Sequence, residues 1–134
     1  MEKIRQIRLL TGKTQADFAK TYGIRLGTLS AWEKGLQKPK KFVVDLLERF
    51  AEEDGTENFP KPPNIIGVGI KRILEISKLE NNEFAQKYGI PQSTVRNWAN
   101  GIIQKPQRHV LFLLERAVRE DTYEPWKSYL DSEN

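Results

Sequence analysis

Apolar residues in this chain recur at three- and four-residue intervals, the spacing that places them on one face of an α-helix. Ile4, Ile7 and Leu10 follow this spacing and predict a first helix over about residues 2–11. No run of useful length alternates apolar and polar residues as a half-buried strand would. The same pattern predicts three further helices in this part of the chain, at about residues 15–22, 26–34 and 39–50.

The residues at the predicted helix ends are those that commonly begin and end helices. Thr14 has a hydroxyl suited to an N-cap, and Gly23 and Gly35 tolerate the left-handed conformation that ends a helix. Pro39 suits a first helical turn, because the N–H that it lacks would be unpaired there. The segment is therefore predicted to form a four-helix domain.

The whole pattern occurs twice. Residues 4–49 align with residues 70–116 with one inserted residue, and 18 of the 46 aligned positions are identical. Shared helical composition does not explain this many identities, which indicate a tandem duplication. The second copy predicts helices near residues 68–79, 82–88, 92–100 and 106–119. The expected fold class is all-α, with two tandem four-helix domains.

The domain boundaries follow from the repeat. We expect the first domain at residues 1–53 and the second at residues 67–121, each near the lower size limit for a self-supporting core. Residues 54–66 pass from acidic residues into prolines, which forbid helix and favour extended backbone, so they are the predicted linker. Residues 122–134 are predicted to form a short helix opened by Pro125, whose apolar face packs on a domain or on a partner subunit.

Composition excludes several kinds of site. The chain has no Cys, and a single His, His109, cannot build a zinc centre; His109 is expected in the core or at an interface. No Gly-rich phosphate loop or catalytic constellation is present, so we expect neither a cofactor nor an enzyme.

No apolar run approaches the roughly 20 residues of a membrane span, and Glu2-Lys3 leave no room for a signal peptide, so a cytoplasmic protein is expected. The formal charge of +4 favours an acidic partner.

A short turn that contains Gly joins the second and third predicted helices of each repeat, at residues 22–25 and 88–91. Such a turn between two short helices is typical of a helix-turn-helix, in which a small residue such as Ala19 lets the helices approach. The first repeat resembles the Cro/repressor-like helix-turn-helix family over about residues 4–50, and the second does so with departures over 70–117. The matching motifs are Thr14-Gln15, Phe18-Ala19, Tyr22-Gly23-Ile24, Thr28-Leu29-Ser30, Trp32-Glu33-Lys34-Gly35 and Lys38-Pro39.

The resemblance implies a lambda repressor-like fold and a DNA-binding regulator, often from a phage, a plasmid or a bacterial control operon, with the third helix in the major groove. It also implies a structural ion pair between Arg8 and Glu33. The second repeat has Leu74 and Ala99 at these positions. Joint replacement is expected of residues that touch, because removing one partner of a buried pair is costly. The alternative is two separate solvated charges.

Candidate base-contacting residues occupy the outward positions of the predicted third helices. In the first repeat they are Arg25, Leu26 and Ser30. In the second repeat they are Gln92, Ser93, Arg96 and Asn97. Gln pairs bidentately with adenine and Arg with guanine, whereas a Leu offers only methyl contact to thymine. The second repeat is therefore expected to discriminate more strongly between sequences. An ordinary solvated helix face is the alternative for these polar residues.

Candidate phosphate contacts cluster at the starts of the second and fourth helices and in the first and last turns of the third. They are Gln15, Thr28, Lys34, Lys38, Lys40 and Lys41 in the first repeat, and Asn81, Thr94, Asn100, Lys105 and Arg108 in the second. Helix N-termini and cationic side chains both bind phosphate oxygens. Any single Lys is explained equally well as a solvated charge, and the recurrence of the cluster favours phosphate binding.

The sequence thus predicts a sequence-specific, double-stranded DNA-binding transcriptional repressor that uses its two units to bind two half-sites. The alternative is an interaction protein, such as an antitoxin or a phage-encoded inhibitor, in which one unit binds DNA and the other binds a protein partner. Weak phosphate candidates such as Asn81 keep that alternative open. Dimerisation through the C-terminal tail or through helical faces is a further expected option, and no membrane association is expected.

Overall fold

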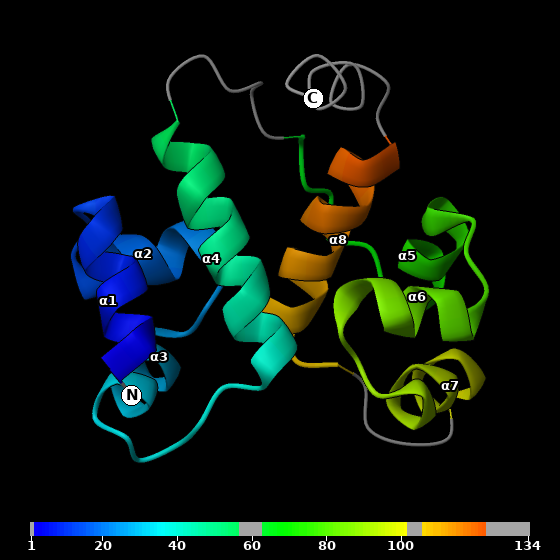
Figure 1. The fold of residues 1–134 in the computed structure, drawn as a ribbon, viewed down its shortest axis with the longest axis horizontal. Coiled ribbons are helices and arrows are strands. Elements are labelled where there is room, and N and C mark those ends of the chain that lie inside the picture. Colours follow the sequence, from blue (N-terminus) through cyan, green and yellow to red (C-terminus); the bar gives the residue numbers. More distant parts are fainter. Residues whose placement is uncertain (1, 57–62, 102–105, 123–134) are drawn as a thin grey trace. The chain divides into compact units, whose positions relative to one another are not determined.

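The computed structural model describes residues 2–56, 63–101 and 106–122, which form eight α-helices and no strand (Figure 1). The first four helices are α1 (Glu2–Thr11), α2 (Gln15–Tyr22), α3 (Leu26–Glu33) and α4 (Lys41–Gly55). The second four are α5 (Ile70–Ser77), α6 (Asn81–Tyr88), α7 (Gln92–Asn100) and α8 (Arg108–Thr122). The chain divides into two compact units, Met1–Phe59 and Pro60–Asn134. The all-α fold with two tandem four-helix domains is confirmed.

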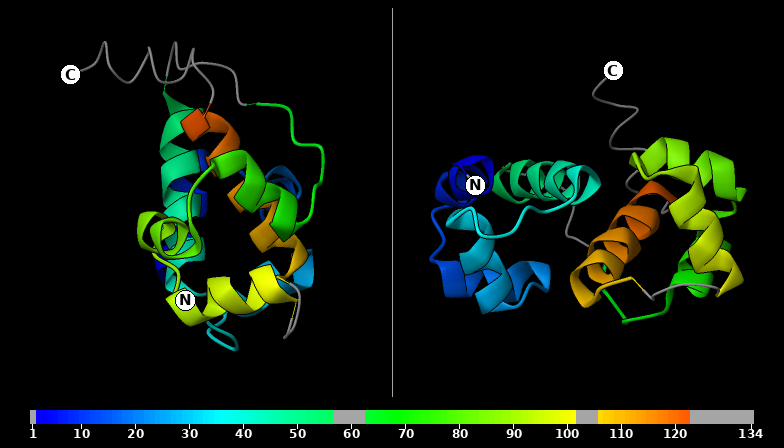
Figure 2. Two further views of the ribbon diagram at one scale, coloured as in Figure 1. Left: turned by 90° about the vertical axis from the view of Figure 1, so that its right-hand side faces the viewer. Right: turned by 90° about the horizontal axis from the view of Figure 1, so that it is seen from below.

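The first unit is organised around α4, which runs beside α1 in the views of Figures 1 and 2. The helices α2 and α3 pack on each other, and α3 also contacts α1. Apolar side chains from all four helices meet in one core, where Ile4, Phe18, Leu29, Leu47 and Phe50 are fully buried. The three- and four-residue spacing of the sequence therefore marks the inner face of each helix.

The second unit repeats the packing, with α5 on α8 and α6 on α7. It also repeats individual side-chain interactions. Tyr22 Oη donates to Asp54 Oδ2 at 2.8 Å, and Tyr88 Oη donates to Asp121 Oδ2 at 2.7 Å. Both tyrosine rings lie 4.8 Å from the phenylalanine one turn earlier, at the same tilt of 55°. The duplication therefore extends past the aligned positions to the last turn of the fourth helices.

Several predicted helix ends differ from the structure by a few residues, and the starts of α4 and α5 do so for identifiable reasons. We predicted that α4 starts at Pro39, but it begins at Lys41, because Lys40 is extended (φ −68°, ψ 149°) and Pro39 lies in the preceding loop. We predicted a start near residue 68 for α5, but it begins at Ile70 because Gly69 is extended. The predicted short helix in the C-terminal tail falls on residues 123–134, which lie outside the described residues.

A non-helical segment before α5, residues 63–69, turns at Gly67 (φ 91°) and is fixed to α8 by one carboxylate. We call it the strap. The backbone N–H groups of Ile66, Gly67 and Val68 donate to the Glu115 carboxylate at 2.8, 2.9 and 3.0 Å. Arg119 Nε completes the set at 2.8 Å, and Glu115 is 1% exposed. The strap therefore belongs to the second unit and includes residues 63–66 of the predicted linker.

Candidate nucleic-acid interface

The turn between the second and third helices has the same geometry in both units. Gly23 and Gly89 each end their helix in the left-handed region, at φ 70°. This lets Ile24 N–H donate to Ala19 O at 2.8 Å, and Ile90 N–H donate to Ala85 O at 2.9 Å. A residue with a Cβ atom is strained at such a φ, which accounts for the Gly.

The small residue before each turn is buried. Ala19 is 3% exposed and Ala85 is 1% exposed, so each side chain lies in the core of its unit. A larger side chain there would force the helices apart, since packed cores have no room for added volume. The sequence therefore sets the angle at which α3 and α7 are presented to solvent.

The outward residues of α3 are mainly apolar or small. Arg25, Leu26 and Gly27 are exposed at the start of the helix, and Thr28 and Ser30 are half-buried. Leu26 is an exposed large apolar side chain, with half of its surface accessible. This end of α3 offers one cation and one methyl-bearing group, as the sequence indicated.

The outward residues of α7 are richer in hydrogen-bonding groups. Gln92, Ser93, Arg96 and Asn100 are exposed, whereas Thr94 and Asn97 are half-buried. Gln92 and Arg96 line a hollow of about 320 Å³ together with Glu80, Asn81 and Asn82 from the start of α6. The structure thus brings the two strongest candidate base contacts beside the candidate phosphate contact Asn81.

The cationic candidates at the fourth helices are available to a ligand where the structure describes them. Lys38, Lys40, Lys41 and Arg108 are exposed, while Lys105 lies outside the described residues. Lys41 Nζ lies 3.8 Å from Asp45 Oδ2, with the lysine side chain 90% exposed, so this pair holds the ammonium only weakly. Residues 14–41 carry six Lys and Arg against two Asp and Glu, and residues 80–108 carry four against two.

The comparisons with known proteins agree with this geometry. The family model described as helix-turn-helix matches the chain twice, at residues 4–55 and 70–124. The chain belongs to the Cro/C1-type helix-turn-helix family. This is a family of DNA-binding domains whose members are generally transcription regulators. Neither a curated protein nor a solved structure matches the chain.

In the first helix-turn-helix unit an ion pair ties α1 to α3. Arg8 Nε donates to Glu33 Oε2 at 2.8 Å and Arg8 Nη2 donates to Glu33 Oε1 at 2.9 Å, a bidentate arrangement. The side chains are 13% and 5% exposed. The hydrogen bond from Arg8 lowers the pKa of Glu33 against the opposing effect of burial, with a further hydrogen bond from Gln15.

That Gln15 contact bears on the phosphate prediction. Because the Gln15 side chain hydrogen-bonds to Glu33, the residue expected to hold phosphate is also part of the structural ion-pair cluster. In the second helix-turn-helix unit the pair is replaced by Leu74, which is buried, and Ala99, which is half-buried. Apolar substitution of both partners leaves no unpaired charge in the core.

One residue that lines the hollow is not among the candidates predicted from the sequence. Glu80 is the N-cap residue of α6 and lines the hollow with Gln92 and Arg96. The aligned residue of the first unit is Thr14, whose hydroxyl accepts from Asp17 N–H at 3.1 Å. A carboxylate repels phosphate where a hydroxyl does not. The alignment of residue 14 with residue 80 was the available signal.

His109, the candidate core or interface histidine, lies in the core of the second unit. His109 is 7% exposed, and burial lowers its pKa, so it is neutral at physiological pH and lies in the core. Among the described residues no group of three His, Cys, Asp or Glu side chains is placed to hold a metal ion. Within that same part of the chain, none of the helices has the length and apolar character needed to cross a membrane.

Proposed function

We propose that this protein is a sequence-specific transcriptional repressor that binds double-stranded DNA, and that its two units make different kinds of contact with the DNA. The first unit contributes phosphate contacts through Lys34, Lys38, Lys40 and Lys41. The second unit contributes base contacts through α7. The observation that carries the proposal is the exposure of Gln92 and Arg96 side by side on the hollow in front of α6, because these residue types pair with adenine and guanine in the major groove.

The two third helices of one chain then act as the two halves of a pseudo-dimer. Half-sites for such a pair lie about one helical turn, roughly 34 Å, apart on one face of the duplex. Because the outward residues of α3 and α7 differ, the operator is not a strict palindrome. Occupancy of such an operator blocks transcription.

The first prediction concerns the dependence of DNA affinity on salt. Replacing Lys41 or Arg108 with Ala should weaken binding to all duplex sequences about equally, since each neutralises one phosphate, and should lower the slope of log K against log salt by about 1. Fluorescence anisotropy of a labelled duplex at several salt concentrations measures both quantities. Lys20→Ala, a change at an exposed lysine outside the candidate set, is the matched control and should leave the slope unchanged. Absence of duplex binding at the lowest salt concentration would refute the proposed repressor function.

The second prediction concerns specificity. Arg96→Ala should cost about 1 to 3 kcal/mol on the preferred operator and relax the requirement at one base pair, most plausibly G·C, with no matching loss on random DNA. Selection of bound fragments from random DNA supplies the operator for this measurement. Arg72→Ala, at an exposed arginine on α5, is the control. Equal losses on specific and random DNA would show that Arg96 contacts only phosphate.

Glu80 favours a second candidate function. Its carboxylate opposes phosphate binding at the start of α6, so α7 would then contact a protein, and the chain would be an interaction protein with one DNA-binding unit. Glu80→Thr, which restores the residue type of Thr14, separates the two proposals. A repressor that uses both units should bind DNA more tightly after this change, whereas a protein-binding second unit should leave DNA affinity unaltered.

A further inference from the structure

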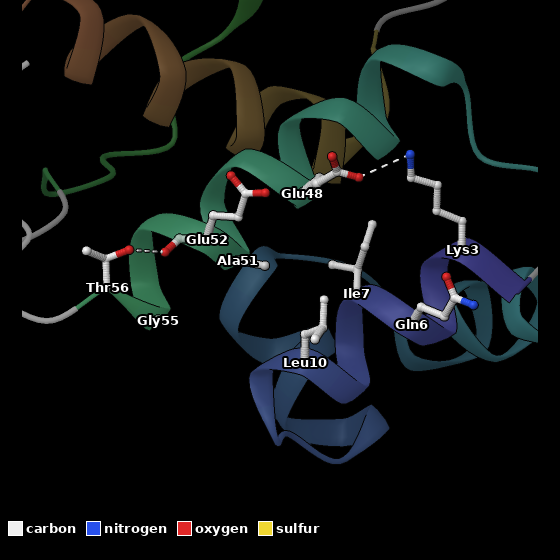
Figure 3. A pocket seen from close by; sticks show the side chains of 9 residues that line it. All are labelled: Lys3, Gln6, Ile7, Leu10, Glu48, Ala51, Glu52, Gly55 and Thr56. Atoms are coloured by element: carbon white, nitrogen blue, oxygen red, sulfur yellow. Dashed lines mark hydrogen bonds and ion pairs between the residues drawn. The ribbon is translucent and has the colours of Figure 1, made fainter. Parts of the chain in front are cut away.

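A groove of about 700 Å³ lies between α1 and α4 of the first unit (Figure 3). It is lined by Lys3, Gln6, Ile7, Leu10, Glu48, Ala51, Glu52, Gly55 and Thr56. Ile7 and Leu10 project from α1 toward α4, and Leu10 is 86% exposed. None of these residues is a candidate for base or phosphate contact. The groove is therefore a feature that the proposed function does not use.

The second unit shows what the same part of the fold can hold. Glu115 of α8 aligns with Glu48 of α4, and Val118 aligns with Ala51. In the second unit the strap lies against α8 at this place, where Glu115 receives three backbone N–H groups. Glu115 and Val118 are both buried, each with 1% of its surface exposed. A backbone segment that turns at a glycine, so that three successive N–H groups face one carboxylate, thus occupies this position in the second unit.

In the first unit the equivalent carboxylate, that of Glu48, forms an exposed ion pair. Glu48 Oε2 lies 3.1 Å from Lys3 Nζ, with the two side chains 44% and 53% exposed. Lys3 aligns with Gly69, the last residue of the strap, so an ammonium stands in for the backbone N–H groups that Glu115 receives. Exposed pairs of this kind contribute about 0 to 1 kcal/mol, so an incoming peptide can displace Lys3 at low cost.

We propose that the groove between α1 and α4 binds an apolar, glycine-containing segment of a partner protein, which turns at the glycine and donates backbone N–H groups to Glu48 as the strap does to Glu115. Ile7, Leu10 and Ala51 form the apolar floor on which its side chains pack. The two carboxylates at the rim, Glu48 and Glu52, outnumber the single cation and select a segment flanked by Lys or Arg. The groove residues are distinct from the candidate DNA contacts of the first unit, so the partner and DNA engage different residues of that unit.

The test uses the full chain and a synthetic, acetylated and amidated peptide with the sequence of residues 61–69, which contains the strap and a preceding Lys. Amide chemical shifts are followed during titration to about 1 mM peptide. Saturable shifts should map to α1 and α4, around Ile7, Leu10 and Ala51. Glu48→Gln should weaken binding at least about tenfold, since hydrogen bonds to a charged acceptor are lost.

Two neighbouring leucines provide a matched pair of variants. Leu10→Asp should abolish peptide binding because it places a charge on the groove floor. Leu9→Asp, a change at a 57% exposed leucine that does not line the groove, should leave binding unchanged. The proposal is overturned by a peptide that binds both variants equally, by shifts confined to α5 and α8, or by no saturable shift.

Two further outcomes would identify a different occupant and also overturn the proposal. Shifts of α1 and α4 that depend on protein concentration without peptide would mean that a second copy of the chain covers the groove. Peptide binding that appears only after deletion of residues 123–134 would mean that the C-terminal tail covers it.

A graft tests the groove independently of peptide affinity. Residues 61–69 are placed directly before Ile4, in place of residues 1–3, so that the added segment precedes α1 as the strap precedes α5. Amide hydrogen exchange in α1 and α4 should slow at least about tenfold, and Glu48→Gln should remove most of this protection. Unchanged exchange in the grafted chain would overturn the proposal.

Discussion

Arg8→Leu is expected to lower the free energy of unfolding of the first unit by about 3 to 5 kcal/mol, because it leaves the buried Glu33 carboxylate without its bidentate partner. Urea denaturation followed by tryptophan fluorescence measures the change, since Trp32 lies in this core. Arg8→Leu combined with Glu33→Ala should recover much of the loss. The second unit already carries the equivalent apolar pair, Leu74 and Ala99.

The same ion pair predicts a pH dependence with a definite sign. The folded-state pKa of Glu33 is lowered, so the unfolded chain binds the proton more tightly. The stabilisation is therefore present above the ordinary glutamate value near 4.5 and is lost as the pH falls through the lower folded value. The double variant should lose this part of the acid sensitivity. Additive losses in the double-mutant cycle would show that the two residues are not coupled.

Glu115→Ala is expected to lower the free energy of unfolding of the second unit by about 3 to 5 kcal/mol. It removes the acceptor of three strap N–H groups and leaves Arg119 without its buried partner. Urea denaturation measures the loss, and amide hydrogen exchange at Ile66, Gly67 and Val68 should accelerate as the strap is released.

The duplication supplies the control for this change. Glu48→Ala removes the aligned carboxylate, which is half-exposed and bonded to Lys3, so it should cost no more than about 1 kcal/mol. Burial raises the pKa of Glu115, but the hydrogen bonds from Arg119 and from the strap outweigh it, and the net pKa is lowered. The contribution of Glu115 is thus lost as the pH falls below about 4.5. Equal effects of the two substitutions would show that the hydrogen bonds from the strap to Glu115 do not stabilise the second unit.

The parts of the fold that the sequence predicts well are those encoded by side-chain type. The spacing of apolar residues locates the helices, and Gly23 and Gly89 mark the turns because only Gly adopts their backbone conformation without strain. The joint change of Arg8 and Glu33 to Leu74 and Ala99 indicates their contact because unpaired buried charge is costly.

The strap and its hydrogen bonds to Glu115 could not be predicted in this way. Glu48 and Glu115 are the same residue type in the same motif, yet one is half-exposed and the other is buried. The difference arises from the backbone N–H groups of Ile66, Gly67 and Val68, and every non-proline residue has such a group. Side-chain identity therefore carries no signal for this interaction. The start of α4 was misplaced for a related reason, since Pro39 is compatible with both a first helical turn and an extended loop.

In the proposed arrangement with two half-sites, the attachment of the strap also limits how strongly the two units cooperate on DNA. With Ile66 held on α8, nine residues of chain separate it from Thr56, and these ten Cα-to-Cα steps span at most about 33 to 36 Å when fully extended. If each unit binds its own half-site as proposed, this short tether determines the effective concentration of the second unit once the first is bound. Release of the strap lengthens the tether to the start of α5 and lowers that concentration. In that arrangement Glu115 affects avidity as well as stability, although it is not one of the candidate DNA contacts.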